Sequence, residues 1–184
     1  MTRVRLTWLG IAFGTVALVC AAPALAGLAV TSDRLVTFHA KGPAGLGIDG
    51  KGNDVKMSDT AGSLDVTVGL ASLRTGIALR DRHMREKYLE THKYPTAKLH
   101  VDKHAIQFPS RGKTVNARSS GLLTLHGVTK RVPFRYSATG TPQRASVNGL
   151  LHVNMNDFKI HVPSYLGVSV KPDVEVAVKF GVTG

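Results

Sequence analysis

The sequence predicts an all-β protein, a sandwich or a barrel of roughly seven or eight antiparallel strands. From Arg34 onward, apolar and polar residues alternate with a period of two, which sends successive side chains to opposite faces of a sheet. Turn-forming stretches such as "DTAGS", "TGTPQ" and "KPDVE" separate these runs. One stretch near residue 80 has helical spacing instead. The chain has no long internal repeat and no low-complexity linker, so we expect one domain after the N-terminal segment.

Residues 1–26 have the pattern of a secretory signal peptide. Two arginines in "MTRVR" precede an apolar run that ends near Ala22, and the small residues of "ALA" at 24–26 suit a cleavage site. A retained anchor is the alternative, although the run is short and contains glycine and proline. We therefore expect export to the bacterial periplasm, with residues 27–184 as the mature domain. Cleavage would remove Cys20, so no disulfide is expected.

Each alternating run presents one apolar face. In "RLVTFHA" the apolar residues fall at every second position, and "LDVTVGL", "AKLHV", "LLTLHG" and "VPFRY" repeat the pattern. Two longer runs, which end at Met155 and Val182, continue it in the last third of the chain. In a sheet with one solvated face, such residues line the interior. The residues predicted to face inward include Phe38, Val66, Val68, Leu123, Leu125, Phe134, Tyr136, Leu151, Val153, Val176, Val178 and Phe180.

The stretch "TGIALRDRHMREKYL" is the densest cluster of charge in the sequence. Met84 and Tyr88 are four residues apart and Leu89 adjoins them, which is the spacing of one helical face. Tyr94-Pro95 stops the helix, because the residue before a proline is disfavoured in the α region. The spacing predicts a short helix over about residues 79–90.

Arg80, Asp81 and His83 lie within this predicted helix and allow three interpretations. The simplest is an ion-paired helix start, with Asp81 in the first turn, where a negative charge is favourable. In the second, Arg80 or His83 contacts the polar head of a molecule beneath the helix. In the third, Asp81 and His83 belong to a catalytic triad whose serine is distant in the sequence, although the chain has no G-x-S-x-G motif. The sequence leaves all three open.

The stretch "GLGIDGKG", residues 45–52, has the spacing of a dinucleotide-binding motif. That motif works only where the glycine turn opens a helix, and the following "NDVKMSD" has strand character. We therefore expect a glycine-rich hairpin loop and no nucleotide. The histidines lack the spacing of a metal site, and we expect them on solvent-facing strand positions. No cofactor and no metal are predicted.

The formal net charge is +12, and the basic residues are spread along the chain without a long block of like charge. Specific nucleic-acid binding is not expected in the predicted compartment. The charge is compatible with attraction to a pyrophosphate or to anionic headgroups, and so with transient contact at a membrane surface.

Three segments resemble the YceI-like family of periplasmic lipid-binding proteins: "SLRTGIALRDRHMREKYLETHKYPTAKL", "GLLTLHGVTKRVPFRYSA" and "IHVPSYLGVSVKPDVEVAVKF". Within them, L-x-T-G at 73–76, R-D-x-H-M at 80–84, Tyr94-Pro95 and L-T-L-x-G-V-T-K at 123–130 carry the resemblance, which covers about residues 36–182. The resemblance implies a lipocalin-like, eight-stranded antiparallel β-barrel. Its lumen would hold a long apolar ligand, typically a polyisoprenoid, a quinone tail or a fatty amide. The first loop lacks the phenylalanine-rich hairpin of the family, which implies a change at one end of the pocket.

The resemblance also implies roles for the predicted helix. It becomes a short flap near residues 79–90, which places Met84, Tyr88 and Leu89 against the lumen beside the inward-facing strand residues. The polar head of the ligand would lie at the rim of the barrel. The candidates for contact with it are Arg80, Asp81 and His83.

The function that follows is a carrier that holds an isoprenoid-like lipid, and not an enzyme. Two alternatives stay open: an enzyme that acts on such a lipid through Asp81 and His83, and a ligand-free structural barrel. Small barrels of this kind often pair, so a homodimer is expected.

Overall fold

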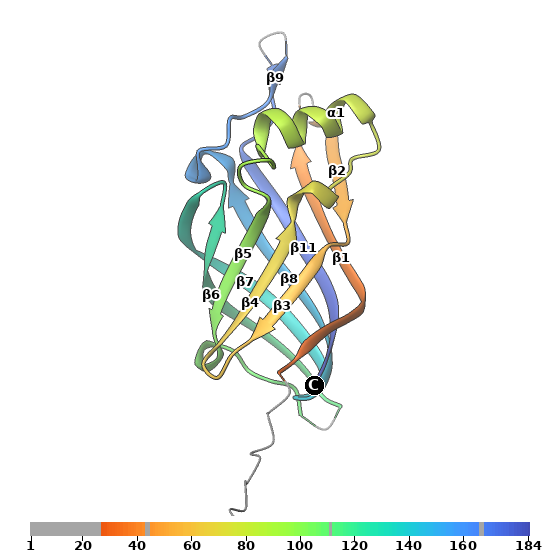
Figure 1. Cartoon of the computed structure of the whole chain (residues 1–184), viewed down its shortest axis with the longest axis vertical. Helices are drawn as coiled ribbons and strands as arrows, with labels where there is room; N and C mark the ends of the chain where they lie inside the picture. Colours follow the sequence, from red (N-terminus) through yellow and green to blue (C-terminus); the bar gives the residue numbers. More distant parts are fainter. Residues whose placement is uncertain (1–26, 43–44, 111, 166–167) are drawn as a thin grey trace, which may run out of the picture.

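In a computed structural model of the protein, which describes residues 27–42, 45–110, 112–165 and 168–184, nine antiparallel strands form one curled sheet (Figure 1). Their order is β2-β1-β11-β8-β7-β6-β5-β4-β3, and the all-β prediction is confirmed. A separate hairpin of β9 (Ser164–Tyr165) and β10 (Val168–Ser169) lies beyond one end of the sheet. The strands of the sheet are β1 (Ala29–Lys41), β2 (Gly47–Gly52), β3 (Val55–Asp59), β4 (Ser63–Gly69), β5 (Thr96–Asp102), β6 (Thr114–Leu125), β7 (Val128–Thr141), β8 (Arg144–Asn154) and β11 (Asp173–Thr183).

The sheet has nine strands where eight were predicted, because one segment is bent in two. β2 and β3 stand at opposite ends of the strand order, yet only Asn53 and Asp54 separate them in the chain. β2 pairs with β1, whereas β3 pairs with β4. The bent segment 47–59 therefore joins the two edges of the curled sheet through the chain itself. Counted as one bent strand, it gives the eight strands of the predicted barrel.

The glycine-rich stretch at 45–52 forms a strand, so the predicted hairpin loop is wrong. It pairs with β1 from Gly47 to Gly52. Gly50 is buried, and a side chain there would overlap the ring of Phe38 on the neighbouring strand. These glycines thus permit close packing against β1, a use of glycine that strand spacing alone does not reveal.

A short helical segment covers one end of the barrel, as predicted (Figure 1). It consists of α1 (Ala78–His83) and a π-helical turn (Met84–Tyr88), so it occupies 78–88 where 79–90 was predicted. Glu90 then adopts a positive φ of 45°, and its carbonyl accepts a hydrogen bond from the Tyr94 N–H at 2.9 Å. This turn ends the segment before Pro95. Other strands are connected by short 3₁₀ turns, which include Leu70–Ser72, Lys103–Ala105 and Met155–Phe158.

Both ends of the barrel are closed by packed side chains. Below α1, Phe158 and Ile160 are buried beside Met155 in the connection that follows β8. At the opposite end, Asp59 forms an ion pair with Lys103 and accepts a hydrogen bond from the backbone N–H of Leu28. Those contacts join β3 to the start of β1 and to the end of β5. The completely buried Val55, at the start of β3, belongs to the same continuous core.

Among the described strands, β3 pairs only with β4, so the sheet is unpaired at that edge, and a second weak place lies between β5 and β6. Their ladder, the shortest in the sheet, pairs only Lys98–His100 with Leu122–Thr124. Toward the end opposite α1, the segment 103–110 runs beside this gap. Side-chain hydrogen bonds hold it there: Ser119 Oγ donates to the Ala105 carbonyl at 2.7 Å, and the Gln107 N–H donates to Tyr136 Oη at 2.6 Å.

The N-terminal prediction concerns a part of the chain that the structure does not describe. Residues 1–26, the predicted signal peptide, lie outside the described ranges. Within those ranges, no helix is long and apolar enough to cross a membrane.

Candidate functional site

The candidate site is the inner face of the barrel. Every residue predicted for the lumen, with the exception of Tyr136, belongs to the hydrophobic core or packs against it. Leu123, Leu125, Leu151, Val153 and Phe180 are buried. The other members are half-buried; those on strands are directed inward by their positions, and three others belong to the flap. The half-buried set comprises Phe38, Val66, Val68, Met84, Tyr88, Leu89, Phe134, Val176 and Val178.

On β7 and β11, half-buried inward residues are followed by buried ones toward the ends of the strands. Along β7, Val132 and Ala138 are buried, whereas Phe134 and Tyr136 between them are not. Along β11, Phe180 is likewise buried and the preceding inward valines are half-buried. Inward residues that keep exposed surface indicate space inside the barrel at this level. The interior is therefore less tightly filled in its middle than at its ends.

Small inward residues account for this space. Tyr136 pairs with Ala117 on β6 and with Gly149 on β8, and Phe134 pairs with Ser119. Cross-strand partners share a face of the sheet, so each aromatic ring has a small neighbour on at least one side. The two rings lie 6.0 Å apart. We call the level defined by Ala117, Ser119, Phe134, Tyr136 and Gly149 the lumen band.

The flap rests on the barrel through its apolar side. Met84, Tyr88 and Leu89 are half-buried and pack against the core, as the helical spacing predicted. The N–H of Leu89 donates to the Met84 carbonyl at 2.9 Å, which is the π-helical bond that holds the three together. A π-helical turn widens the helix at this point and directs these side chains toward one side.

Asp81 is the one buried charged residue of the described chain, and its carboxylate fixes the loop before α1. Its Oδ1 accepts hydrogen bonds from the Thr75 backbone N–H and from Thr75 Oγ1, both at 2.6 Å. Arg80 Nε donates to the same hydroxyl oxygen at 2.8 Å. The Thr75 hydrogen bonds, reinforced by the charges of Arg85 and Arg74, hold the pKa of Asp81 below its ordinary value.

His83 takes no part in this arrangement. It is exposed on α1, and residues two apart on a helix do not face each other. The structure thus brings Arg80 and Asp81 together on Thr75 and leaves His83 outside. The sequence analysis missed Thr75 as their partner, although the L-x-T-G motif contains it.

A second anchor of the flap was also missed. His126, in the turn between β6 and β7, contacts Glu90 through Nε2 at 2.8 Å, and its ring lies 4.5 Å from that of Tyr94. Its other ring nitrogen lies 3.2 Å from the Phe158 carbonyl. The expectation that the histidines face solvent is therefore wrong for His126. Its position one residue before a glycine in "HG" is the only local signal, because the partners are distant in the sequence.

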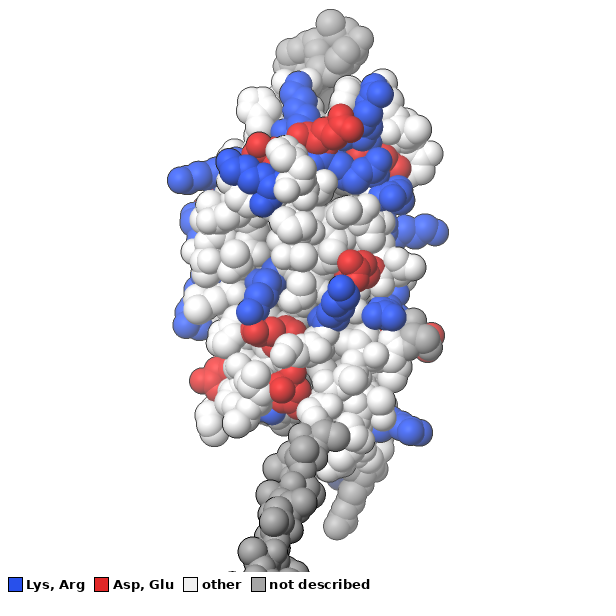
Figure 2. All heavy atoms as spheres, viewed as in Figure 1, with Lys and Arg blue, Asp and Glu red and all other residues white. Residues whose placement is uncertain are grey.

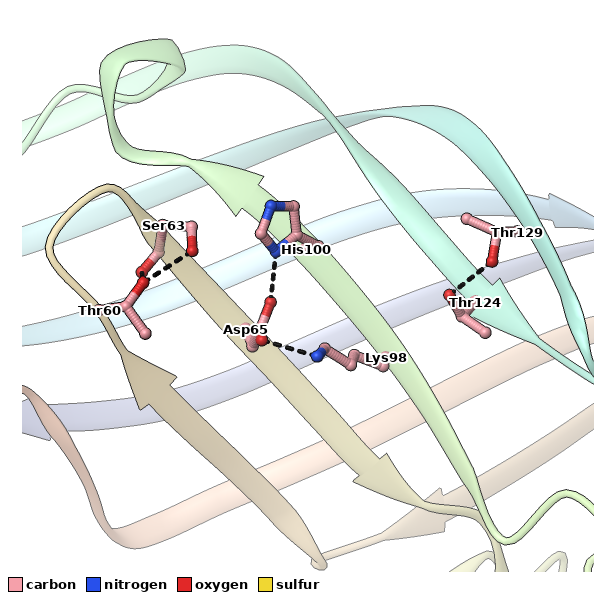
Figure 3. A network of polar contacts seen from close by, with 7 residues as sticks. All are labelled: Thr60, Ser63, Asp65, Lys98, His100, Thr124 and Thr129. Atoms are coloured by element: carbon pink, nitrogen blue, oxygen red, sulfur yellow. Dashed lines mark hydrogen bonds and ion pairs between the residues drawn. The ribbon is translucent and has the colours of Figure 1, made fainter.

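Polar pairs cover the outer wall rather than the lumen. Figure 3 shows Asp65 on β4 between Lys98 and His100 on β5, with contacts of 2.7 and 2.6 Å. Burial opposes the ionisation of Asp65, but its hydrogen bonds to the two neighbours outweigh this and lower its pKa. Farther along the wall, the hydroxyl groups of Thr124 and Thr129 lie 2.8 Å apart (Figure 3). The described part of the chain has no group of histidine, cysteine and acidic residues placed to hold a metal ion.

Two hollows also open on the outer wall. One, of about 460 Å³, lies over β1, β2 and β11 and is lined mainly by residues that alternate with the inward set, such as Thr37, His39 and Lys51. The other, of about 550 Å³, lies over β6, β7 and β8, beside Arg118, Arg135 and Asn148. The first hollow is separate from the lumen band, whereas the second shares Ala117, Tyr136 and Gly149 with it.

A model of the YceI-like domain matches residues 32–182. The chain belongs to the YceI-like domain family. This YceI-like domain is 34% identical to a UPF0312 protein of Pseudomonas savastanoi pv. phaseolicola over 121 residues, which is 62% of this chain and 60% of the relative. It is 33% identical to a UPF0312 protein of Pseudomonas putida over 123 residues, 63% of this chain and 62% of the relative. The alignments thus span less than two thirds of these relatives.

Solved structures share the fold. A polyisoprenoid binding domain from Saccharophagus degradans, implicated in plant cell wall breakdown, superposes with a TM-score of 0.71 at 18% identity, over 86% of this chain and 98% of that one. BcnA of Burkholderia cenocepacia superposes with a TM-score of 0.63 at 16% identity, over 82% and 96%. At these identities the likeness concerns the fold, and it agrees with the predicted lipocalin-like barrel.

Proposed function

We propose that this YceI-like domain is an exported carrier that holds the apolar tail of an isoprenoid-like lipid in its barrel. The observation that carries the proposal is the lumen band, where inward apolar residues keep exposed surface between two packed ends. A tail that fills such a space gains about 0.8 kcal/mol for each buried methylene-sized unit. Affinity can therefore come from the tail alone, with few polar contacts.

Family membership and one structural neighbour support the choice of ligand. The neighbour from Saccharophagus degradans is described as a polyisoprenoid binding domain. By extension, we propose a polyprenyl chain, a quinone tail or a fatty amide for this chain. Such molecules are insoluble in water, so a protein exported to the periplasm could carry them by keeping their apolar tails away from water. The pattern of residues 1–26 is what motivates this location.

The rim residues receive different roles in this proposal. Asp81 fixes the loop that precedes the flap, since its Oδ1 is already occupied by Thr75. Arg80 and His83 remain the candidates for the head group. We propose binding without turnover, because Asp81 and His83 lie on different sides of α1 and so do not form a dyad. No cofactor is proposed. Light scattering, which gives the molar mass in solution, tests the expected homodimer.

Native mass spectrometry of gently purified mature protein, followed by solvent extraction, tests the carrier function. We expect a stoichiometric long-chain lipid, or its uptake when a quinone or polyprenol is offered. Ala117→Phe should exclude it, because Ala117 faces Tyr136 across the lumen band. Asn116→Phe, the neighbouring position on the outer face, is the matched control and should retain the lipid.

The alternatives give different results. A clean apo mass with no uptake by the wild type would contradict the carrier and favour a structural barrel. Conversion of the offered lipid, abolished in His83→Ala while the lipid still binds, would favour an enzyme.

A further inference from the structure

The most exposed large apolar side chains of the described chain lie at one end of the barrel. Leu46, Leu79 and Ile77 are 67%, 55% and 53% exposed. Ile77 and Leu79 stand at the start of α1, and Leu46 precedes β2 in the connection from β1. The other exposed large apolar residues lie elsewhere. Leu35 and Leu122 are on the strands of the wall, and Phe108 is in the segment after β5, at the opposite end.

The backbone places Leu46 and the start of α1 on the same side. Lys51 and Arg74 exchange two backbone hydrogen bonds, each of 2.8 Å. From this point β2 leads back to Leu46, and the chain leads forward to Ile77. Both paths run toward the end that α1 covers (Figure 1).

Positive charge surrounds these apolar residues. On the flap, Arg82 and Lys87 are exposed beside Glu86, whereas Arg80 and Arg85 are half-buried near Thr75 and Asp81. Lys41 and Lys171 are adjacent, because the Lys171 N–H donates to the Lys41 carbonyl at 2.8 Å. Leu46 lies beside them, since its carbonyl accepts from the Gly42 N–H at 2.6 Å. Figure 2 shows Lys and Arg gathered around this end, with acidic side chains between them.

We propose that this end docks on an anionic lipid bilayer, with Leu46, Ile77 and Leu79 inserted among the acyl chains and Lys41, Arg82 and Lys171 at the headgroups. Apolar side chains rimmed by basic ones are what an interfacial surface requires. Docking in this orientation presents the flap, and the lumen behind it, to the layer that contains the lipids. This deepens the carrier proposal and rests on it for its purpose, but it makes a separate physical claim.

The composition of the surface favours a membrane over a protein partner. Its anchors are aliphatic, whereas the strongest anchors of protein interfaces are tryptophan, tyrosine and arginine in closed pockets. The anchors also lie on two separate segments, the connection before β2 and the start of α1. A bilayer can accept such isolated side chains, because it has no fixed shape to match.

Sedimentation with vesicles tests the apolar part of the proposal. We expect wild-type protein to bind phosphatidylglycerol-containing vesicles, to leave phosphatidylcholine vesicles unbound, and to dissociate as salt is raised. The triple variant Leu46→Ser, Ile77→Ser and Leu79→Ser should bind at least about tenfold more weakly. The control triple Leu35→Ser, Leu122→Ser and Phe108→Ser removes the same number of exposed apolar residues and should stay within about twofold of wild type.

Two charge-reversal variants, a test triple and a control triple, examine the role of the basic residues. Reversing the charge of Lys41, Arg82 and Lys171 to Glu should abolish binding, whereas the same change at Arg118, Arg135 and Lys179, on the outer wall, should reduce it only about twofold. Equal loss in both triples would mean diffuse attraction and would overturn the proposal. So would a wild type that ignores anionic vesicles, which would leave this surface to a protein partner.

Lipid retention separates this result from the carrier function. Native mass spectrometry of the docking variants, with lipid offered in detergent, should show unchanged loading. Loss of vesicle binding with normal loading is the expected outcome. Normal vesicle binding in a protein that never takes up lipid would refute the carrier and leave the docking intact.

Discussion

At the scale of single residues, one threonine organises the polar side of the flap. Thr75 donates twice to Asp81 and accepts from Arg80, so three motif residues form one unit. The hydroxyl of Thr75 is the largest cause of the lowered pKa of Asp81. The loop conformation therefore depends on a neutral side chain that no charge pattern would single out.

Thr75→Val should raise the pKa of Asp81 toward its ordinary value of about 3.9, because the variant keeps the shape but loses the hydroxyl donor. Carbon-detected NMR titration of the Asp81 carboxyl group measures this. Thr67→Val, on the outer face of β4, is the control and should leave the value unchanged. An unaltered pKa in Thr75→Val would show that the arginines, and not the hydroxyl, set it.

The same scale shows which site residues a sequence can identify. The lumen face was predictable, because a period of two assigns each strand residue to one side. Thr75 with Asp81, and His126 with Glu90, were not. The first contact depends on how the loop turns before α1, and the second joins residues that meet only once β6 and β7 lie under the flap.

At the scale of elements, the bent segment 47–59 decides how the sheet closes. Its two halves pair with opposite edges, and completely buried Val55 begins the second half. Sequence patterns predicted strands such as β4, β7 and β11 because each has a plain alternation. They failed for β2, where glycines packed against Phe38 look like turn residues.

Val55→Ala should destabilise the protein by about 2–3 kcal/mol, because it removes two buried methyl groups and leaves a cavity at the bend. Urea unfolding followed by circular dichroism gives the free energy. Leu35→Ala, on the exposed face of β1, should change it by about 0.5 kcal/mol or less. Similar losses in both variants would mean that the bend is not a packing centre.

At the scale of the whole molecule, the carboxylate of Asp59 joins the segments that close the end opposite α1. Asp59 connects β3, the start of β1 and the end of β5 through Lys103 and the Leu28 N–H. Burial opposes its ionisation, yet these partners prevail and leave the pKa of Asp59 below its ordinary value. No local pattern in the sequence predicts this closure, since the three segments meet only in the finished barrel.

Asp59→Asn should lower the free energy of unfolding at pH 7 by roughly 1–3 kcal/mol, since it breaks a largely buried ion pair. A carboxylate with a lowered folded-state pKa contributes its full stability above the unfolded value of about 3.9 and loses it as the pH falls through the folded value. The difference between wild type and variant should therefore be constant above pH about 5 and vanish in acid. Chemical unfolding from pH 2 to 7 measures it, and Asp33→Asn, at an exposed position of β1, should show no such trend. A difference that persists at the lowest pH would assign the effect to packing.

If the domain is a carrier as proposed, the short ladder between β5 and β6 has a consequence for the length of the lipid it can hold. Beside this ladder the wall is completed by the segment 103–110, which a few side-chain hydrogen bonds hold in place. A barrel with a continuous wall holds only a tail that is no longer than its interior. Here a longer tail could displace the hydrogen bonds of segment 103–110 and extend its far end into the solvent. The opening beside β5 and β6 would then limit the thickness of the tail, and the height of the barrel would not limit its length.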